Sequence, residues 1–159
     1  MAETFTTHVD WTGAAGGATR DAATFSRDLA LAAAGLSLPL SSAPGYQGDP
    51  SRLNPELMFV GALSACQALT YLFLAARKQV VVTAYVDDAE GMLEMVDGRM
   101  RMSRVTLRPR ITLEAGSDEG TARALVARAH DGCFIANSVS AAVDIEPVFD
   151  WVPAPTVAT

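Results

Sequence analysis

The sequence predicts an α+β protein in which a largely antiparallel β-sheet packs around a long apolar helix and a second helix. Two segments carry the start signals of helices, one at residues 54–56 and the other at residues 117–119. Strand-forming stretches lie around them, in the order strands, helix, three strands, helix, strand. Because helices are outnumbered and do not alternate strictly with strands, this order favours α+β over a parallel α/β sheet.

Length and composition suit one domain over residues 1–159, with loose ends at about 1–3 and 152–159. Half of the residues are hydrophobic, which is enough for a sizeable core without disulfide bonds. Acidic residues number 18 and basic ones 12, for a formal net charge of -6. Nucleic-acid binding depends on clustered Lys and Arg, so we expect no nucleic-acid partner.

The N-terminal third predicts two strands and a long loop. Residues 4–11 indicate a short strand, residues 12–17 (TGAAGG) a flexible turn, and residues 24–33 a second strand. The next twenty or so residues, from Gly35 to Pro55, are dense in Gly, Pro and Ser and show no period. A loop of that length inside a compact domain is usually functional, for example as a lid or a substrate wall.

The first helix is predicted from residue 55 to about Lys78. Asn54 is a favourable N-cap, Pro55 suits the first helical position, and Glu56 places a carboxylate in the first turn. Residues 57–76 then run without a charge, which is long enough to span a bilayer. Polar residues interrupt this run, and the flanking strands need an apolar partner, so we expect an enclosed core helix and no membrane association.

The second half predicts a meander, a helix and a last strand. Residues 80–85 and 91–96 indicate strands, and Asp97-Gly98 is a strong hairpin signal before a long strand over residues 100–114. Pro109 inside that strand suggests an edge or a bulge. A helix is expected over residues 117–132 and a strand over residues 143–151.

Two cysteines, Cys66 and Cys133, are the main chemical candidates. They can be small buried hydrophobic residues, or a redox pair in which one thiolate attacks an oxidant and the other forms a disulfide with it. A metal site is not expected, because only His8 and His130 accompany them and no C-x-x-C motif is present. The start of the chain carries no secretion signal, so we expect the reducing cytoplasm.

Two motifs around these cysteines resemble those of the OsmC/Ohr family of osmotically inducible and organic hydroperoxide resistance proteins. The first, NPELMFVGALSACQ, keeps nine residues between Glu56 and Cys66. The second, RAHDGCFIANS, places Ala129 and His130 before Cys133, as in the A-H-x-x-C pattern. Both occur in the family's order within a similar run of elements. Phe134 departs from the pattern, since proline is usual after the second cysteine, and Gln67 follows the first cysteine.

This resemblance implies a thiol peroxidase that reduces organic hydroperoxides without a metal or organic cofactor. Cys66 would be the peroxidatic nucleophile and Cys133 the resolving thiol, joined in an intramolecular disulfide that a lipoyl-type or thioredoxin-type dithiol reduces. The family also pairs the helix-opening glutamate, here Glu56, with an arginine from the N-terminal strand region. Both Arg20 and Arg27 fit that description, with Arg27 slightly favoured. The alternative function is a non-catalytic binding protein for a small apolar ligand on the same fold.

The expected roles agree with thiol chemistry. Burial in apolar surroundings raises a thiol's pKa above its reference value of about 8.5, so Cys66 alone would be inert. A guanidinium held by Glu56 would favour the thiolate and donate to the peroxide oxygen. Apolar side chains of the long loop, among them Leu38, Leu40 and Tyr46, would favour bulky organic hydroperoxides.

Helix geometry separates Glu56 from Cys66. Ten positions on a continuous helix correspond to about 15 Å of rise and roughly 80° of rotation, so one arginine cannot bridge the two side chains. Either the helix breaks at Gly61 or Glu56 serves the cysteine of a second subunit. We favour an intertwined homodimer with two composite sites, because a two-fold axis places each Glu56 near the opposite Cys66. A partner would also cover the apolar helix.

Overall fold

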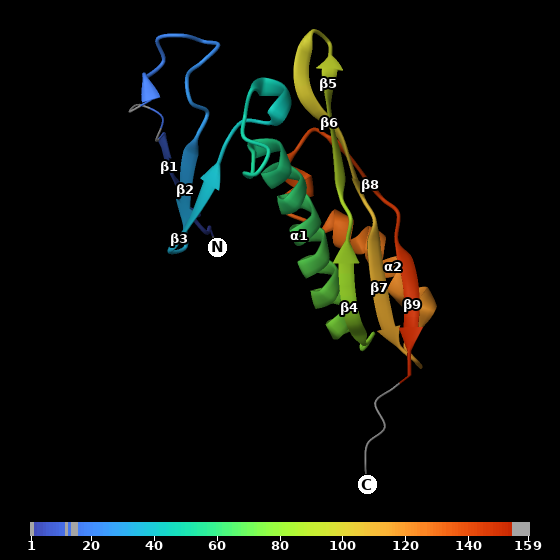
Figure 1. Cartoon of the computed structure of the whole chain (residues 1–159). Helices are drawn as coiled ribbons and strands as arrows, with labels where there is room; N and C mark the ends of the chain where they lie inside the picture. Colours follow the sequence, from blue (N-terminus) through green and yellow to red (C-terminus); the bar gives the residue numbers. More distant parts are fainter. Residues whose placement is uncertain (1, 12, 14–15, 154–159) are drawn as a thin grey trace. The chain divides into compact units, whose positions relative to one another are not determined.

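The computed structural model describes residues 2–11, 13 and 16–153, and these form two compact units, Met1–Met58 and Phe59–Thr159 (Figure 1). Part of the turn predicted at residues 12–17 and most of the loose C-terminal end predicted at residues 152–159 lie outside the described residues. Val152, by contrast, belongs to the last strand, so regular structure continues beyond the predicted end at Trp151.

The N-terminal unit contains a three-stranded antiparallel sheet in the order β1-β2-β3. Its strands are β1 (His8–Trp11), β2 (Leu29–Ala33) and β3 (Leu36–Leu40). The third strand corrects the prediction of an unstructured loop after Gly35. Leu36, Leu38 and Leu40 alternate with small residues, and this period of two is a strand signal among the prolines and serines. A 3-10 helix, η2 (Pro44–Tyr46), follows, and Leu40 is buried.

Helix α1 (Pro55–Arg77) begins where the sequence predicts and continues without a break past Gly61. The Asn54 side chain accepts a hydrogen bond from the backbone N–H of Leu57 at 2.8 Å, which caps the first turn. One stripe of α1 is buried, and its four members recur at every fourth position: Leu63, Gln67, Tyr71 and Ala75. The expected N-cap and helical span are therefore confirmed.

The C-terminal unit contains two three-stranded ribbons with the orders β4-β7-β9 and β5-β6-β8. Their strands are β4 (Val82–Asp87), β5 (Glu90–Val96), β6 (Arg99–Leu107), β7 (Pro109–Glu114), β8 (Ala142–Ile145) and β9 (Val148–Val152). The pairs β4–β7 and β5–β6 are antiparallel, whereas β8 and β9 add in parallel to β6 and β7. The α+β class with antiparallel-rich sheets is thus confirmed.

The predicted long strand is interrupted at Arg108, between β6 and β7. The backbone N–H of Arg108 donates to Asp87 at 2.7 Å, and its guanidinium pairs with Glu90 at 3.2 Å and Glu146 at 3.1 Å. The chain passes from one ribbon to the other between β4 and β5, between β6 and β7, and between β8 and β9. The bonds of Arg108 hold these three connections together. Pro109 is the first residue of β7, which lies in the centre of its ribbon, so the predicted edge position is wrong. At a strand's first position proline is tolerated.

Helix α2 (Glu119–Asp131) packs beside α1 on one face of β7. Asp118 caps it by accepting a hydrogen bond from the backbone N–H of Thr121 at 2.7 Å. The Gln67 amide donates to the carbonyl oxygen of Val126 at 3.1 Å, so the two helices are bonded to each other as well as packed. Their shared core consists of buried residues from both helices and the ribbon, namely Tyr71, Ala75, Val80, Ile111, Leu113, Ala122, Leu125, Val126, Ala129 and Phe149.

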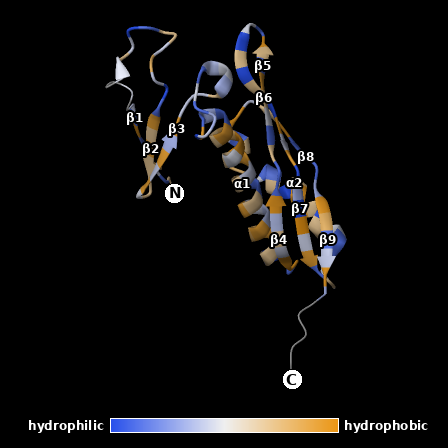
Figure 2. Cartoon of the chain, in the orientation of Figure 1, coloured by the Kyte–Doolittle hydropathy of each residue, from blue (hydrophilic) through white to orange (hydrophobic). Residues whose placement is uncertain are grey.

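The outer face of α1 is apolar and exposed in the single chain, as the orange segments along α1 in Figure 2 illustrate. Leu69 is 69% exposed and Phe73 61% exposed. The expectation of an enclosed helix is therefore wrong for one chain, because the two ribbons and helix α2 cover only one stripe of α1. By length and composition α1 would be able to cross a membrane, and 22% of its most apolar window is buried within the chain.

Candidate functional site: the thiol pair

The structure brings Cys66 and Cys133 together, and both are free thiols. Cys66 lies in the middle of α1, at the border between the buried stripe and the exposed face, and is half-buried. Cys133 follows the end of α2 and is 1% exposed. The two cysteines are 67 residues apart in sequence, and the packing of α2 against α1 brings them together. Cys66 is the thiol that solvent can reach.

Hydrogen bonds favour the thiolate of Cys66. Partial burial acts to raise its pKa, but the Cys133 thiol, the backbone N–H groups of Ile135 and Phe134 and the Thr70 hydroxyl all donate to its sulfur. Together they outweigh burial and hold the pKa of Cys66 below the ordinary value of a thiol. Thr70 also reaches the carbonyl oxygen of Cys66 at 2.8 Å, so its single proton has two acceptors one helical turn away.

Cys133 has the opposite tendency. Burial first, and then the neighbouring Cys66, raise the pKa of Cys133 above the ordinary value. The backbone N–H of Ala136, which donates to its sulfur at 3.4 Å, and that of Ile135 offset part of this effect. Of the two thiols, Cys66 is therefore the one that ionises first as the pH rises, and Cys133 is the one that keeps its proton.

An apolar groove of about 410 Å³ adjoins the thiol pair. Its walls come from α1 and from the end of α2, and comprise Leu69, Thr70, Phe73, Leu74, Arg128, Gly132 and Phe134. Thr70 and Phe134 also donate to Cys66, which places one end of the groove beside the reactive sulfur. Phe134, at 82% exposed, stands where proline was expected and gives this end an aromatic wall.

Glu56 and the two candidate arginines belong to the N-terminal unit. Glu56 has a buried carboxylate oxygen, Oε2, without a hydrogen-bond partner among the described residues, and it forms no ion pair there with Arg20 or Arg27. The Arg27 guanidinium instead donates to the carbonyl oxygens of Phe25 and Ala22, the latter at 2.7 Å, and lies 3.9 Å from the centre of the Phe25 ring. Arg20 is exposed and donates to Gly17 at 3.1 Å.

Neither histidine joins the thiols in a metal-binding group. His8 is exposed on β1, and His130 lies in α2 with a buried Nδ1 that has no partner among the described residues. Within the part of the chain that the structure describes, no three His, Cys, Asp or Glu side chains gather closely enough to hold a metal ion.

Sequence reasoning missed the donors that act on Cys66. It assigned thiolate stabilisation to an arginine, which stays a prediction, and it did not foresee the described donors, namely the Cys133 thiol, Thr70 and the backbone N–H groups of Phe134 and Ile135. The position of Thr70, four residues after Cys66 on a predicted helix, was a usable signal. The two backbone donors had no sequence signal, because they depend on how the chain turns after Cys133.

The chain belongs to the OsmC-like protein family, whose model matches residues 48–148. That range includes Glu56, Cys66 and Cys133 but neither Arg20 nor Arg27. The family includes proteins named for resistance to organic hydroperoxides. A comparison with curated protein sequences gave no match.

Solved structures show the same fold. An OsmC-like protein of unknown function from Vibrio cholerae is 29% identical, with a TM-score of 0.85 over 93% of this chain and 100% of that one. An organic hydroperoxide resistance protein from Legionella pneumophila is 19% identical, with a TM-score of 0.67 over 94% and 98%. One from Elizabethkingia anophelis is 17% identical, with a TM-score of 0.67 over 96% and 100%.

Proposed function

We propose that this protein is a thiol-dependent peroxidase that reduces organic hydroperoxides to alcohols. The observation that carries the proposal is the adjacent pair of free thiols with opposite pKa shifts, Cys66 lowered and Cys133 raised. A peroxidatic cysteine must be a thiolate within reach of its substrate, and a resolving cysteine must lie close enough to form a disulfide with it. The lowered pKa and partial exposure of Cys66, with buried Cys133 beside it, support these two roles.

The reaction follows from this arrangement. The Cys66 thiolate attacks one peroxide oxygen, so that an S–O bond forms, the O–O bond breaks and the alkoxide leaves. The proton on Cys133 completes the alcohol, and the resulting Cys133 thiolate attacks the sulfenic acid of Cys66. A disulfide forms and hydroxide leaves. An external dithiol, lipoyl-type or thioredoxin-type, then returns two electrons, which fits a reducing compartment such as the cytoplasm.

Variants of the two cysteines test this division of labour. One equivalent of an alkyl hydroperoxide should remove both thiols of the reduced wild-type protein, as measured by thiol titration. Cys66→Ser should consume no peroxide, whereas Cys133→Ser should react once and leave a sulfenic acid that dimedone traps. Full activity of Cys66→Ser would overturn the proposal. Two thiols inert to hydroperoxide in the wild-type protein would favour the alternative, a non-catalytic protein that binds an apolar ligand in the groove.

We further infer a homodimer with composite sites. Because α1 is unbroken from Pro55 to Arg77, Glu56 lies about 15 Å along the helix from Cys66, and one arginine cannot bridge them. One Glu56 carboxylate oxygen has no partner among the described residues and needs a hydrogen-bond donor, and the exposed apolar face of α1 needs to be covered. In a dimer with a two-fold axis, a second copy covers this face, and Glu56 with its arginine from one chain meets the two cysteines of the other chain.

Subunit exchange tests the composite site. Glu56→Ala and Cys66→Ser chains, each expected to be inactive alone, should form a heterodimer with one intact site when mixed. Peroxidase activity near half that of wild type per heterodimer is the expected result. If exchange is demonstrated, for instance with differently tagged chains, and no activity returns, Glu56 and the cysteines act within one chain.

A further inference from the structure

The turn that follows α2, residues 133–139, directs three of its backbone N–H groups at sulfur. The N–H of Ala136 donates to Cys133 at 3.4 Å, and those of Phe134 and Ile135 donate to Cys66. The remaining N–H groups of the turn donate to backbone carbonyl oxygens of residues 130–136, and they belong to Cys133, Asn137, Ser138 and Val139. Because a backbone N–H that loses contact with water needs an acceptor, the two amides that face Cys66 depend on its sulfur.

Phe134 contributes to the thiol site through its main chain, since its ring is exposed. Every residue except proline carries a backbone N–H, and this chain has phenylalanine at the position where proline is usual in OsmC/Ohr proteins. With proline there, Ile135 would be the one amide of this pair left to Cys66. The departure from proline therefore adds one hydrogen-bond donor to the site.

Two polar side chains hold the turn in shape. The Asn137 Nδ2 donates to the carbonyl oxygen of Asp131 at 2.9 Å, which ties the turn to the last residue of α2. The Ser138 Oγ donates to the carbonyl oxygen of Phe134 at 2.7 Å. That carbonyl and the N–H of Ile135 belong to one planar peptide group. The Ser138 hydroxyl, by holding the carbonyl, therefore fixes the direction in which the Ile135 N–H points.

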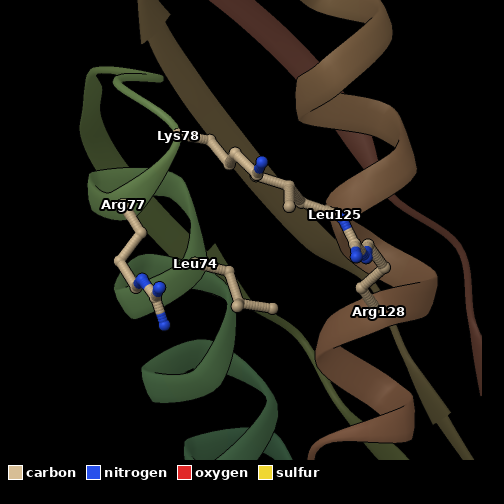
Figure 3. A pocket seen from close by; sticks show the side chains of 5 residues that line it. All are labelled: Leu74, Arg77, Lys78, Leu125 and Arg128. Carbon is tan, nitrogen blue, oxygen red and sulfur yellow. The ribbon is translucent and has the colours of Figure 1, made fainter.

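The positively charged side chains of the two helices do not supply these donors. A hollow of about 340 Å³ at the end of α1 is lined by the residues that Figure 3 shows, namely Leu74, Arg77, Lys78, Leu125 and Arg128. Arg77 is eleven positions beyond Cys66, which corresponds to roughly 17 Å of rise along the helix. The described groups that lower the pKa of Cys66 are all hydrogen-bond donors.

We propose that Asn137 and Ser138 are positioning residues for Cys66, and that they hold the Phe134 and Ile135 amides as a two-donor site for its thiolate. Successive backbone N–H groups that converge on one point form an anion-binding concavity. Because these amides are fixed before a substrate arrives, they stabilise the anion without rearrangement. The consequence for catalysis rests on the peroxidase function proposed above, since the thiolate is the form that attacks a hydroperoxide.

The first test removes one amide and leaves the other groups in place. In Phe134→Pro the pKa of Cys66 should rise by roughly one unit, because a hydrogen bond to a charged acceptor is lost. Phe134→Ala is the matched variant: it loses the ring, keeps the N–H and should keep the wild-type pKa. The pH dependence of iodoacetamide alkylation of the reduced protein, followed on the Cys66 peptide by mass spectrometry, measures both. Equal pKa values in two folded variants would overturn the proposal.

The second test concerns the side chains that hold the turn, and it decides the matter if circular dichroism shows that Phe134→Pro does not fold. Ser138→Ala and the double variant Asn137→Ala/Ser138→Ala should raise the pKa of Cys66, by up to about one unit in the double variant. Ser138→Thr, which keeps the hydroxyl, should restore the wild-type pH profile. Ser103→Ala is the control, because its hydroxyl donates to Glu94 on the β5–β6 hairpin. A wild-type profile in the double variant would reject the positioning role.

Alkylation needs no hydroperoxide, so it separates this inference from the peroxidase proposal. A raised pKa in Phe134→Pro, together with a wild-type protein that consumes no hydroperoxide, would sustain the two-donor site and reject the peroxidase. Consumption of an alkyl hydroperoxide, together with unchanged pKa values in every variant of the turn, would reject the two-donor site and keep the peroxidase. If both proposals hold, the peroxidase rate of Phe134→Pro should fall roughly tenfold relative to Phe134→Ala below the pKa of Cys66.

Discussion

Helices α1 and α2 pack on the same face of β7, yet their outer faces differ. The exposed side of α2 carries charged and small residues, such as Arg123, Ala124 and Ala127, and its cation Arg123 pairs with Glu119 at 2.7 Å. The exposed side of α1 carries Leu69 and Leu72 instead. Water can hydrate the charged outer face of α2, but it cannot form favourable contacts with the leucines of α1. Of these two helices, α1 is therefore the one suited to contact another chain.

The same contrast applies to the two thiols. Cys66 lies where the uncovered face of α1 begins, so a substrate or a second subunit can approach it, while Cys133 is enclosed after α2. Every donor described around Cys66 comes from its own helix, from Cys133 or from the turn that follows Cys133. Helix α1 therefore carries the thiol whose pKa is lowered, and the segment after α2 supplies most of the hydrogen bonds that lower it.

Charging the outer face of α1 should have the largest effect. In Leu69→Glu a carboxylate would enter the proposed dimer contact, which we expect to weaken association by roughly a hundredfold or more and to abolish peroxidase activity with it. Ala124→Glu, at an exposed position of α2, is the matched control and should leave both unchanged. Sedimentation velocity and peroxide turnover measure the two results. A fully dimeric and active Leu69→Glu protein would contradict the assignment of this face.

Removal of the guanidinium should have the next largest effect. If an arginine of the N-terminal unit adds to the donors from the α2 side, its loss raises the pKa of Cys66 and slows peroxide attack at neutral pH, by roughly ten- to a hundredfold. Activity should partly return at high pH, where the thiolate forms without help. Rate-versus-pH curves of Arg20→Ala and Arg27→Ala identify the residue. Two curves identical to that of wild type would leave the donors around Cys133 as the complete set.

Loss of the Thr70 hydroxyl should have the smallest effect. Thr70→Val keeps the shape but removes one donor to the thiolate, so the pKa of Cys66 should rise by less than about one unit. At pH values between the wild-type pKa and the higher pKa of the variant, a smaller fraction of Cys66 is thiolate in the variant. The rate there should fall severalfold, while the plateau at high pH is kept. Thr70→Ser should restore the wild-type profile. An unchanged profile in Thr70→Val would show that the hydroxyl bonds to the Cys66 carbonyl alone.

The sequence by itself determined the helices, the class of fold and the two thiols. Asn54, Pro55 and Asp118 act locally, through hydrogen bonds and dihedral preferences that need no distant partner, so the starts of both helices could be predicted. Asp97 and Gly98 likewise adopt positive φ angles of 50° and 76° at the predicted hairpin. Strand β3 was missed because prolines and serines obscured a short alternation of leucines.

Only the tertiary structure decided what surrounds each thiol. The backbone N–H groups of Phe134 and Ile135 carry no sequence signal, since any residue has one, and their direction depends on the turn after Cys133. The interruption at Arg108 and the central position of Pro109 arise from pairing between strands far apart in sequence. Local sequence signals determine where helices and turns form, because they act between neighbouring residues. The pKa of a thiol depends on its distance to donors from remote segments, which only the packed chain determines.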